Sequence, residues 1–232
     1  MKKIINNFVC IILIFVAQGV FAKNLGARKQ RFVKKMTALS EQVNQRILKS
    51  REQLEHLATI PVKKLSSEDE ALLQKLASKY KVNGWNVDNK SDWDRLLRRV
   101  DIVPTSLVVA QSAIESAWGT SRFAKAGNNL FGQWCYKKGC GIVPLRRPAG
   151  RTYEVQKFRS TMDSINAYVH NLNTNPSYRS LREKRSVLRT TNQPITGYAL
   201  ASGLSRYSQL GEKYVGIVRG VINRYQLNHY TA

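Results

Sequence analysis

After residue 22 the sequence has no long apolar run, so we expect no membrane-spanning helix in the rest of the chain. Residues 1–22 themselves combine a basic start, an apolar run and a small-residue end. This is the pattern of a secretory signal peptide, with cleavage expected after Ala22. A retained membrane anchor is the alternative, but the apolar run is shorter than the ~20 residues that span a bilayer. We therefore expect secretion across the inner membrane to the periplasm or cell envelope.

Cysteine and histidine are both scarce, with three residues of each in 232. Cleavage of the signal peptide would remove Cys10 and leave Cys135 and Cys140 in the short loop CYKKGC. An even pair in an exported protein predicts a disulfide. Zinc is the competing interpretation, but the histidines are scattered and supply no obvious ligand pair. We expect no metal and no organic cofactor.

Acidic residues are few, because 15 Asp and Glu face 38 Lys and Arg, which gives a net charge of +23. The charge is still +21 once Lys2 and Lys3 leave with the signal peptide. Export makes nucleic acid an unexpected partner, and the charge favours an anionic envelope surface instead. A solvated basic surface without a specific ligand stays open as the other interpretation.

Helical periodicity dominates the first part of the chain. Apolar residues recur at helical spacing from Ala27 to Ala58, and Pro61 ends that pattern. Ser66 then begins a second helix with an acidic first turn, which is typical of a capped helix start. We predict an N-terminal helical region over residues 23–95 and a catalytic domain over residues 96–230.

The segment after Pro104 predicts a helix that is apolar on every face except a narrow polar stripe. From Cys135 to Phe158, glycines and prolines separate short alternating runs, which predict a small β-hairpin lobe. Helical patterning then returns toward the C-terminus. With 43% hydrophobic residues the chain can bury a true core. The sequence therefore predicts a mainly α fold, a helical bundle with a small β-hairpin lobe and an N-terminal helical extension.

The predicted helix includes the apolar stretch from Leu107 to Trp118, and Glu115 is the one charged residue in that stretch. A carboxyl group in apolar surroundings is costly to ionise, so its pKa rises and it can keep a proton near neutral pH. Such a group suits the general acid that protonates the leaving oxygen in glycoside cleavage. The alternative is an ordinary glutamate that faces solvent.

Several separate motifs follow one another along the chain, namely AQSAIESAWGTSRFA, NNLFG, TYEVQKFRS and NPSY. Their order and spacing resemble the glucosaminidase family, which includes flagellar and autolytic β-N-acetylglucosaminidases of bacterial cell walls. The segments WCYKKGCGIVPLRR and GYALASGLSRYSQLGEKYVGIV look like the Bax-type members of that family. The resemblance runs from Pro61 to Leu227. It implies a lysozyme-like α+β fold and hydrolysis of the bond after N-acetylglucosamine in peptidoglycan.

The same resemblance implies catalytic roles for three residues. Glu115 matches the essential glutamate of the family. Glu154 falls on the hairpin where many members carry a second acidic residue, and as a base it would activate water; the alternative is a strand residue that faces water or pairs with Arg151 or Arg159. Tyr178 in NPSY matches a tyrosine beside the catalytic glutamate, where it would hold a nucleophilic water or the acetamido group of the substrate.

Four further residues are predicted to contact substrate: Trp118, Asn129, Phe131 and Trp134. The aromatic rings could stack on the apolar face of a pyranose. Phe131 suits the core equally well, Asn129 could instead brace the turn around NNLFG, and Trp118 could shield Glu115.

Together these patterns predict an exported peptidoglycan hydrolase that cleaves β-1,4 glycosidic bonds after N-acetylglucosamine by carboxylate general acid catalysis. The expected partners are peptidoglycan glycan strands and an anionic envelope surface, and the chain is expected to be a monomer. A peptidoglycan-binding protein that does not cut, and a wall amidase, remain as alternatives.

Overall fold

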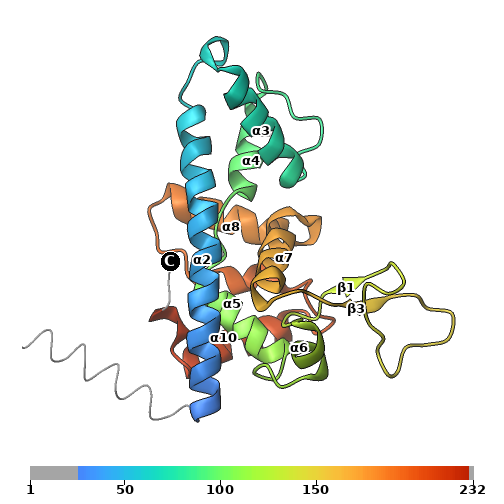
Figure 1. The fold of residues 1–232 in the computed structure, drawn as a ribbon. Helices are drawn as coiled ribbons and strands as arrows, with labels where there is room; N and C mark the ends of the chain where they lie inside the picture. Colours follow the sequence, from blue (N-terminus) through green and yellow to red (C-terminus); the bar gives the residue numbers. More distant parts are fainter. Residues whose placement is uncertain (1–25, 230–232) are drawn as a thin grey trace, which may run out of the picture.

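The computed structural model describes residues 26–229, so the predicted signal peptide lies outside the described residues. These residues form a bundle of helices with one small β lobe at its side (Figure 1). The helices are α2 (Ala27–Leu57), α3 (Ser67–Lys79), α4 (Lys90–Arg99), α5 (Thr105–Glu115), α6 (Arg122–Gly127), α7 (Thr161–Thr174), α8 (Arg179–Thr190), α9 (Gly197–Leu200) and α10 (Glu212–Arg224). Short 3-10 helices are η1 (Val62–Lys64), η2 (Pro176–Tyr178), η3 (Ala201–Leu204) and η4 (Leu227–His229). The prediction of a mainly α fold with a small β lobe is confirmed.

The helix α2 runs along most of the molecule (Figure 1). Its buried residues recur every three or four positions, so one face is covered along its whole length. That face packs against α5 and α7, and it belongs to the same apolar core as the C-terminal helices. The helix predicted from Ala27 to Ala58 is confirmed to within one residue. Within the part of the chain that the structure describes, no helix has the length and apolar character needed to cross a bilayer.

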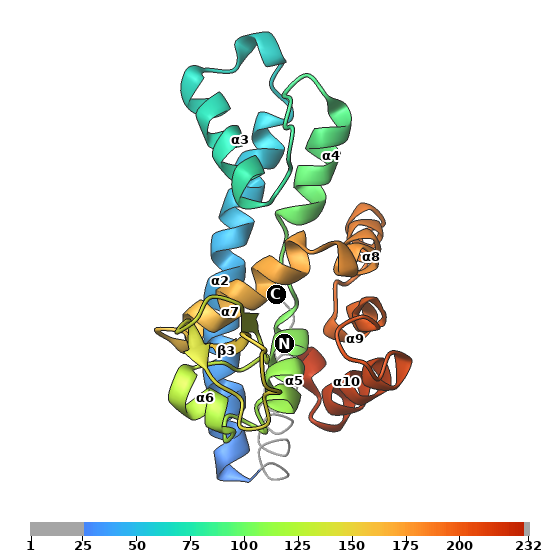
Figure 2. The same ribbon diagram turned by 90° about the vertical axis from the view of Figure 1, so that its right-hand side faces the viewer.

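The helices α3 and α4 lie beside the C-terminal part of α2 (Figure 2). A capping box opens α3, because the Asp69 amide donates to Ser66 Oγ at 3.2 Å and the Ser66 amide donates to Asp69 Oδ2 at 3.1 Å. The predicted capped start of this helix is therefore confirmed. Leu73 and Leu96 from these two helices join the common core.

The helix α5 is the central element of the bundle, since every residue from Thr105 to Ala113 is buried. The sequence predicts that it continues to Trp118, and this is wrong because the helix ends at Glu115. Ala117 and Trp118 adopt left-handed backbone conformations with φ of 50° and 59°, which cost non-glycine residues roughly 1–2 kcal/mol each. The Trp118 amide donates to the Ala113 carbonyl at 2.9 Å, which closes the helix end. Glu115 therefore stands at the C-terminal end of a buried helix.

The β lobe is a three-stranded antiparallel sheet of β1 (Trp134–Cys135), β2 (Gly141–Ile142) and β3 (Glu154–Gln156), in the order β1-β3-β2. Trp134 pairs with Val155 across β1 and β3, and Ile142 pairs with Val155 across β2 and β3. A disulfide joins Cys135 to Cys140 and closes the loop between β1 and β2, so the predicted disulfide is confirmed.

The C-terminal helices cover α5 from the other side (Figure 2). Gly197 allows α9 to approach α5 closely, because a side chain there would meet Ser106 Oγ at 2.4 Å and the Leu107 nitrogen at 2.6 Å. The helix α10 also packs on α5. This contact brings the side chains of α10 to the end of α5 where Glu115 lies.

Candidate active site

Glu115 is half-buried at the end of α5. Tyr214 of α10 donates a hydrogen bond of 2.6 Å to Glu115 Oε1. Gly132 of the NNLFG segment lies near Oε2, since a side chain at this position would begin 3.7 Å from that oxygen. Burial raises the pKa of Glu115 above its ordinary value, and the hydrogen bond from Tyr214 only partly opposes the rise. The helix dipole acts in the same direction as burial, because the C-terminal end of a helix disfavours a negative charge.

A chain of hydrogen bonds fixes the orientation of the groups behind Glu115. Tyr168 of α7 donates to Gln111 Oε1, and Gln111 Nε2 donates to the Tyr214 hydroxyl at 3.0 Å. Because the Tyr214 oxygen accepts from Gln111, its own proton points to Glu115 Oε1. Glu115 Oε1 is thus a hydrogen-bond acceptor. A proton carried by Glu115 therefore belongs on the other oxygen, Oε2, on the side of Gly132.

Replacing Tyr214 with Phe should raise the pKa of Glu115 further, because the change removes the hydrogen bond that favours the carboxylate. NMR titration of carbon-13-labelled glutamate side chains measures this pKa directly. Tyr198→Phe removes a hydroxyl from an exposed tyrosine on α9 and should leave the pKa of Glu115 unchanged. An unaltered pKa in Tyr214→Phe would show that the hydroxyl does not stabilise the charged form.

Tyr178 lies in a cluster of aromatic side chains with Tyr207 and Tyr214. Its ring lies 6.0 Å from that of Tyr207, which in turn stacks on Tyr214 at 5.4 Å. Burial raises the pKa of the Tyr178 hydroxyl, a hydrogen bond with the Asn171 side chain opposes the rise, and the negative charge of Glu115 adds to it. The phenol is therefore neutral and close enough to Glu115 to respond to its charge.

Glu154 is buried within the β lobe and is held by the loop that the disulfide closes. The Gly139 amide donates to Oε1 at 3.0 Å and the Gly141 amide donates to Oε2 at 2.8 Å. These two backbone hydrogen bonds lower the pKa of Glu154, with smaller contributions from Arg147 and Lys138. Glu154 is thus held by two backbone amides. It is buried away from solvent, and neither Arg151 nor Arg159 forms an ion pair with it.

The predicted substrate contacts occupy different surroundings. Phe131 is buried and stacks on Tyr168, with ring centroids 4.0 Å apart. Trp118 packs edge-on against Tyr225 at 4.8 Å and also contacts a phenylalanine of α2. Trp134 is 48% exposed and packs against Tyr153 with the two rings nearly perpendicular. Of the three predicted aromatic contacts, Trp134 is the most exposed, so it is the most accessible to a ligand.

All hydrogen-bonding groups of the Asn129 side-chain amide have partners within the protein. Its Nδ2 donates to the Gln133 and Gln156 carbonyls at 2.8 and 2.9 Å. Its Oδ1 accepts from the Phe131 and Gln133 amides at 3.3 and 3.1 Å. Two donors and two acceptors are the full capacity of this group, so the side chain joins the NNLFG turn to strand β3.

Sequence reasoning named Tyr178 but missed three other tyrosines near Glu115. Tyr214 holds the carboxylate, Tyr168 orients the relay, and Tyr207 donates to the Phe131 carbonyl at 2.9 Å. Tyr207 and Tyr214 both lie in the segment GYALASGLSRYSQLGEKYVGIV, which contributed to the family resemblance but to no residue assignment. The presence of these two tyrosines in a segment that resembles a family of hydrolases is the signal that could have identified them as site residues.

Comparison with known proteins identifies the class to which this site belongs. Residues 90–227 match the family model described as "Glucosaminidase: Mannosyl-glycoprotein endo-beta-N-acetylglucosaminidase". This match covers more than half of the chain, so the chain belongs to the glucosaminidase family. The resemblance to the glucosaminidase family inferred from the motifs is confirmed.

A curated relative is "Protein bax" of Escherichia coli (strain K12), which is 42% identical over 149 residues. The aligned region covers 64% of this chain and 53% of that protein, so the chain matches about half of its relative's length. Among solved structures, the catalytic domain of the autolysin Auto from Listeria monocytogenes is similar with a TM-score of 0.48 and 18% identity. That similarity covers 89% of each chain.

Proposed function

We propose that this chain is an exported peptidoglycan hydrolase that cleaves the β-1,4 bond after N-acetylglucosamine, with Glu115 as the general acid. The observation that carries the proposal is the environment of this carboxyl group. It is half-buried, its pKa is raised, Tyr214 occupies one oxygen and Gly132 leaves room beside the other. A carboxyl group of this kind keeps a proton at the pH of the cell envelope and can release it to a sugar oxygen.

In the proposed reaction Glu115 transfers the proton on Oε2 to the glycosidic oxygen as the bond to the anomeric carbon breaks. The carboxylate that forms is stabilised by the Tyr214 hydroxyl, which already points to Oε1. Water then attacks the positively charged anomeric carbon, and the proton that it loses returns to the Glu115 carboxylate, which restores the acid. The neutral Tyr178 phenol near Glu115 supports a role in holding that water or the acetamido group of the substrate.

We assign Glu154 an anchoring role in preference to that of a general base. Both of its oxygens accept backbone hydrogen bonds from the loop between β1 and β2, and its pKa is lowered. A base must take a proton from water, which a carboxylate with a low pKa does poorly. The carboxylate instead holds the disulfide loop against β3 and so shapes the β lobe that presents Trp134.

Replacing Glu154 with Ala should therefore loosen the loop, and a small anion in the vacated space would meet the Gly139 and Gly141 amides, where it replaces the anchor and not a base. We expect trypsin to cut the variant after Lys137 or Lys138 while the parent resists, as judged on reducing gels. We also expect sodium azide to restore no activity. Glu41→Ala, an exposed acidic residue on α2, is the matched control and should behave as the parent. Azide-dependent activity with a glycosyl azide product would instead establish Glu154 as the base.

Peptidoglycan as substrate is supported by family membership and by the exposed lobe. Trp134 is an exposed aromatic side chain, and the charge of +21 expected after removal of Lys2 and Lys3 favours an acidic wall. The sequence of residues 1–22 supports export, which would place the enzyme in the periplasm or cell envelope.

The experiment that tests the proposed function is digestion of purified peptidoglycan followed by mass spectrometry of borohydride-reduced fragments. The proposed enzyme produces new reducing ends on N-acetylglucosamine, and Glu115→Gln produces none. Reducing ends on N-acetylmuramic acid would contradict the assigned bond. Release of free stem peptides would establish an amidase, and sedimentation with peptidoglycan without any fragments would establish a binding protein.

A zinc amidase receives no support from the described residues. Between residues 26 and 229, one cluster has the side-chain types and proximity of a metal site, and it consists of Cys135, Cys140 and Glu154. Its two sulfur atoms are joined in a disulfide, and its carboxylate accepts two backbone hydrogen bonds. None of the three is thus free to act as a metal ligand in this state.

A further inference from the structure

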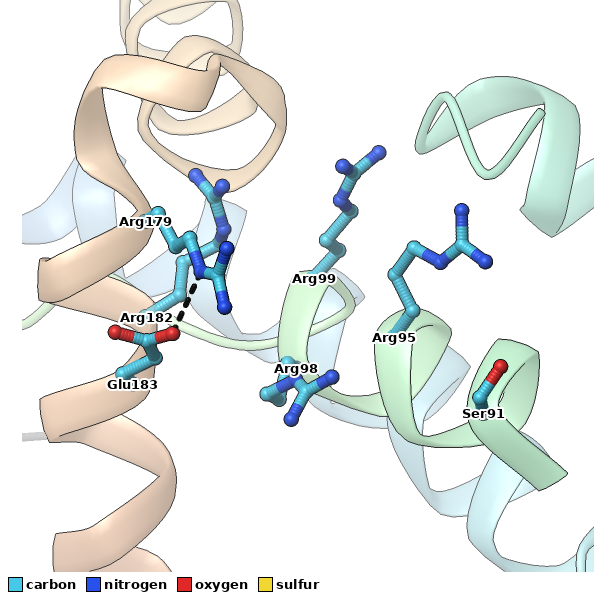
Figure 3. A pocket seen from close by; sticks show the side chains of 7 residues that line it. All are labelled: Ser91, Arg95, Arg98, Arg99, Arg179, Arg182 and Glu183. Atoms are coloured by element: carbon cyan, nitrogen blue, oxygen red, sulfur yellow. Dashed lines mark hydrogen bonds and ion pairs between the residues drawn. The ribbon is translucent and has the colours of Figure 1, made fainter.

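A pocket between α4 and α8 is lined almost entirely by arginines. It has a volume of about 300 Å³, which is at the lower end for ligand sites. Figure 3 shows its lining, with the guanidinium groups of two facing helices around a shared space. The lining residues are Ser91, Arg95, Arg98 and Arg99 from α4 and Arg179, Arg182 and Glu183 from α8. None of them belongs to the site around Glu115, and the β lobe lies in another part of the molecule (Figure 2).

The acidic groups near the pocket neutralise only part of this charge. Glu183 pairs with Arg179 at 2.7 Å, and Asp92 pairs with Arg95. Three lining arginines, Arg98, Arg99 and Arg182, have no carboxylate partner among residues 26–229. The pocket therefore keeps a net charge of about three positive units after its internal ion pairs are counted.

Two of these arginines are held rigidly by the protein backbone. Arg182 is buried and donates to the Leu172 and Asn175 carbonyls, each at 2.8 Å. Arg99 donates to the Tyr80 and Lys81 carbonyls at 2.9 and 2.6 Å. A guanidinium that is already fixed loses little freedom when it binds an anion with its remaining N–H groups.

The arginines also repel one another. Burial, together with the charges of Arg99 and Arg185, lowers the pKa of Arg182 to about 10. Burial likewise lowers the pKa of Arg99, together with the charges of Arg95 and Arg98. An anion placed between the two helices would relieve this repulsion.

We propose that this pocket binds a compound that carries two phosphate groups. Guanidinium forks match the oxygens of phosphate in a bidentate manner. A phosphate group carries a charge of about −1.5 to −2 near pH 7, so two such groups balance the three unpaired arginines. A single carboxylate would leave most of that charge uncompensated. The volume of about 300 Å³ is also larger than one phosphate group requires.

Isothermal titration calorimetry with inorganic pyrophosphate tests the proposal, and it does not depend on hydrolytic activity. We expect saturable binding of one pyrophosphate per chain at constant ionic strength. The double variant Arg98→Ala and Arg179→Ala should bind at least tenfold more weakly, because both side chains line the pocket. Both are exposed or largely exposed, so the fold should persist, as circular dichroism can verify.

The matched control is the double variant Arg31→Ala and Arg46→Ala, which removes the same charge from exposed positions on α2. Its affinity should lie within twofold of that of the parent. Equal weakening in both double variants, or no saturable binding by the parent, would overturn the proposal, since either result indicates general attraction to a basic surface.

Two sources of the phosphate groups are distinguished by co-sedimentation with vesicles that contain a polyprenyl pyrophosphate, a lipid whose headgroup carries two phosphate groups. Retention that pyrophosphate competes away, and that the pocket variant loses, assigns the site to a lipid headgroup. Tight pyrophosphate binding without retention on vesicles assigns it to a free phosphorylated compound.

Discussion

Glu115→Gln should lower kcat on peptidoglycan by about 10²–10⁴-fold, which is the usual contribution of a general acid. The amide has nearly the same shape, and its oxygen can still accept the hydrogen bond from Tyr214. It has no proton to transfer to the leaving oxygen. Because the substrate contacts remain, KM should change much less than kcat. Release of soluble fragments from labelled peptidoglycan measures both.

The same variant should keep its fold, and its stability provides a second readout. The pKa of Glu115 is raised in the folded protein, so this group favours folding below its unfolded pKa of about 4.3. That contribution is lost as the pH rises through the folded pKa. Gln carries no such charge, so Glu115→Gln should be at least as stable as the parent at neutral pH. Thermal unfolding at pH 7 and below pH 4 should show the difference shrinking in acid.

Glu41→Gln makes the same chemical change on an exposed face of α2 and should leave activity intact. Parent-like activity in Glu115→Gln would contradict the assigned acid. Inactivity combined with a large loss of stability would point to a structural role for Glu115, because a neutral isostere at a site that raises the pKa should not destabilise the fold.

Local signals made much of the fold predictable. The long helix α2 has apolar positions at helical spacing, and the start of α3 carries its capping residues within four positions of one another. Glu115 was a candidate from the sequence because it is the sole charge in an apolar stretch. Each of these features depends on residues that are close in sequence.

The partners of Glu115 could not be predicted in the same way. Tyr214 lies 99 positions from Glu115, and Tyr168 lies 57 positions from Gln111. No periodicity indicates that Tyr214 of α10 faces the end of α5. These contacts arise from the packing of α7 and α10 on α5, which is a property of the whole bundle.

One local prediction and one alternative failed for physical reasons. The end of α5 depends on left-handed conformations at Ala117 and Trp118, which are uncommon for residues other than glycine and asparagine. For Glu154, one alternative was a strand residue that faces water while Val155 points to the other side. Both residues are buried, because β3 is the central strand and the disulfide loop covers the face that carries Glu154.

Asp101→Asn should destabilise the protein by about 3–5 kcal/mol, the usual cost of breaking a buried charge pair. Asp101 is 2% exposed and is the shared carboxylate of three arginines. Arg189 contacts it through two nitrogens, and Arg51 and Arg185 each approach it to 3.4 Å. These partners come from α2 and α8, so a single carboxylate connects the N-terminal helix with the C-terminal half of the bundle.

The penalty arises chiefly at Arg185, whose side chain is completely buried. Burial lowers the pKa of Arg185 to about 10, so the guanidinium stays charged at neutral pH. Burial alone would raise the pKa of Asp101, but Arg185, Arg189 and Arg51 together hold it below its ordinary value. Loss of the carboxylate would leave a buried positive charge without its counter-charge.

Chemical denaturation at pH 7 measures the change in the free energy of unfolding. Asp163→Asn is the matched control, because its pair with Arg159 is exposed and spans 3.6 Å; removing such a pair should cost less than about 1 kcal/mol. The pKa of Asp101 is lowered in the folded state, so its contribution is present above the unfolded pKa of about 3.9 and disappears as the pH falls through the folded pKa. The gap between parent and Asp101→Asn should close accordingly in acid.

Adding Arg185→Met to Asp101→Asn separates charge from shape. If the unpaired guanidinium causes the loss, the double variant should recover part of the stability, because it no longer buries an uncompensated charge. If the loss instead reflects the hydrogen bonds that Arg185 donates to the Ile102 and Arg98 carbonyls, removing the arginine should destabilise the variant further. The sign of the change on adding Arg185→Met therefore decides whether electrostatics or backbone bracing makes Asp101 indispensable to this junction of helices.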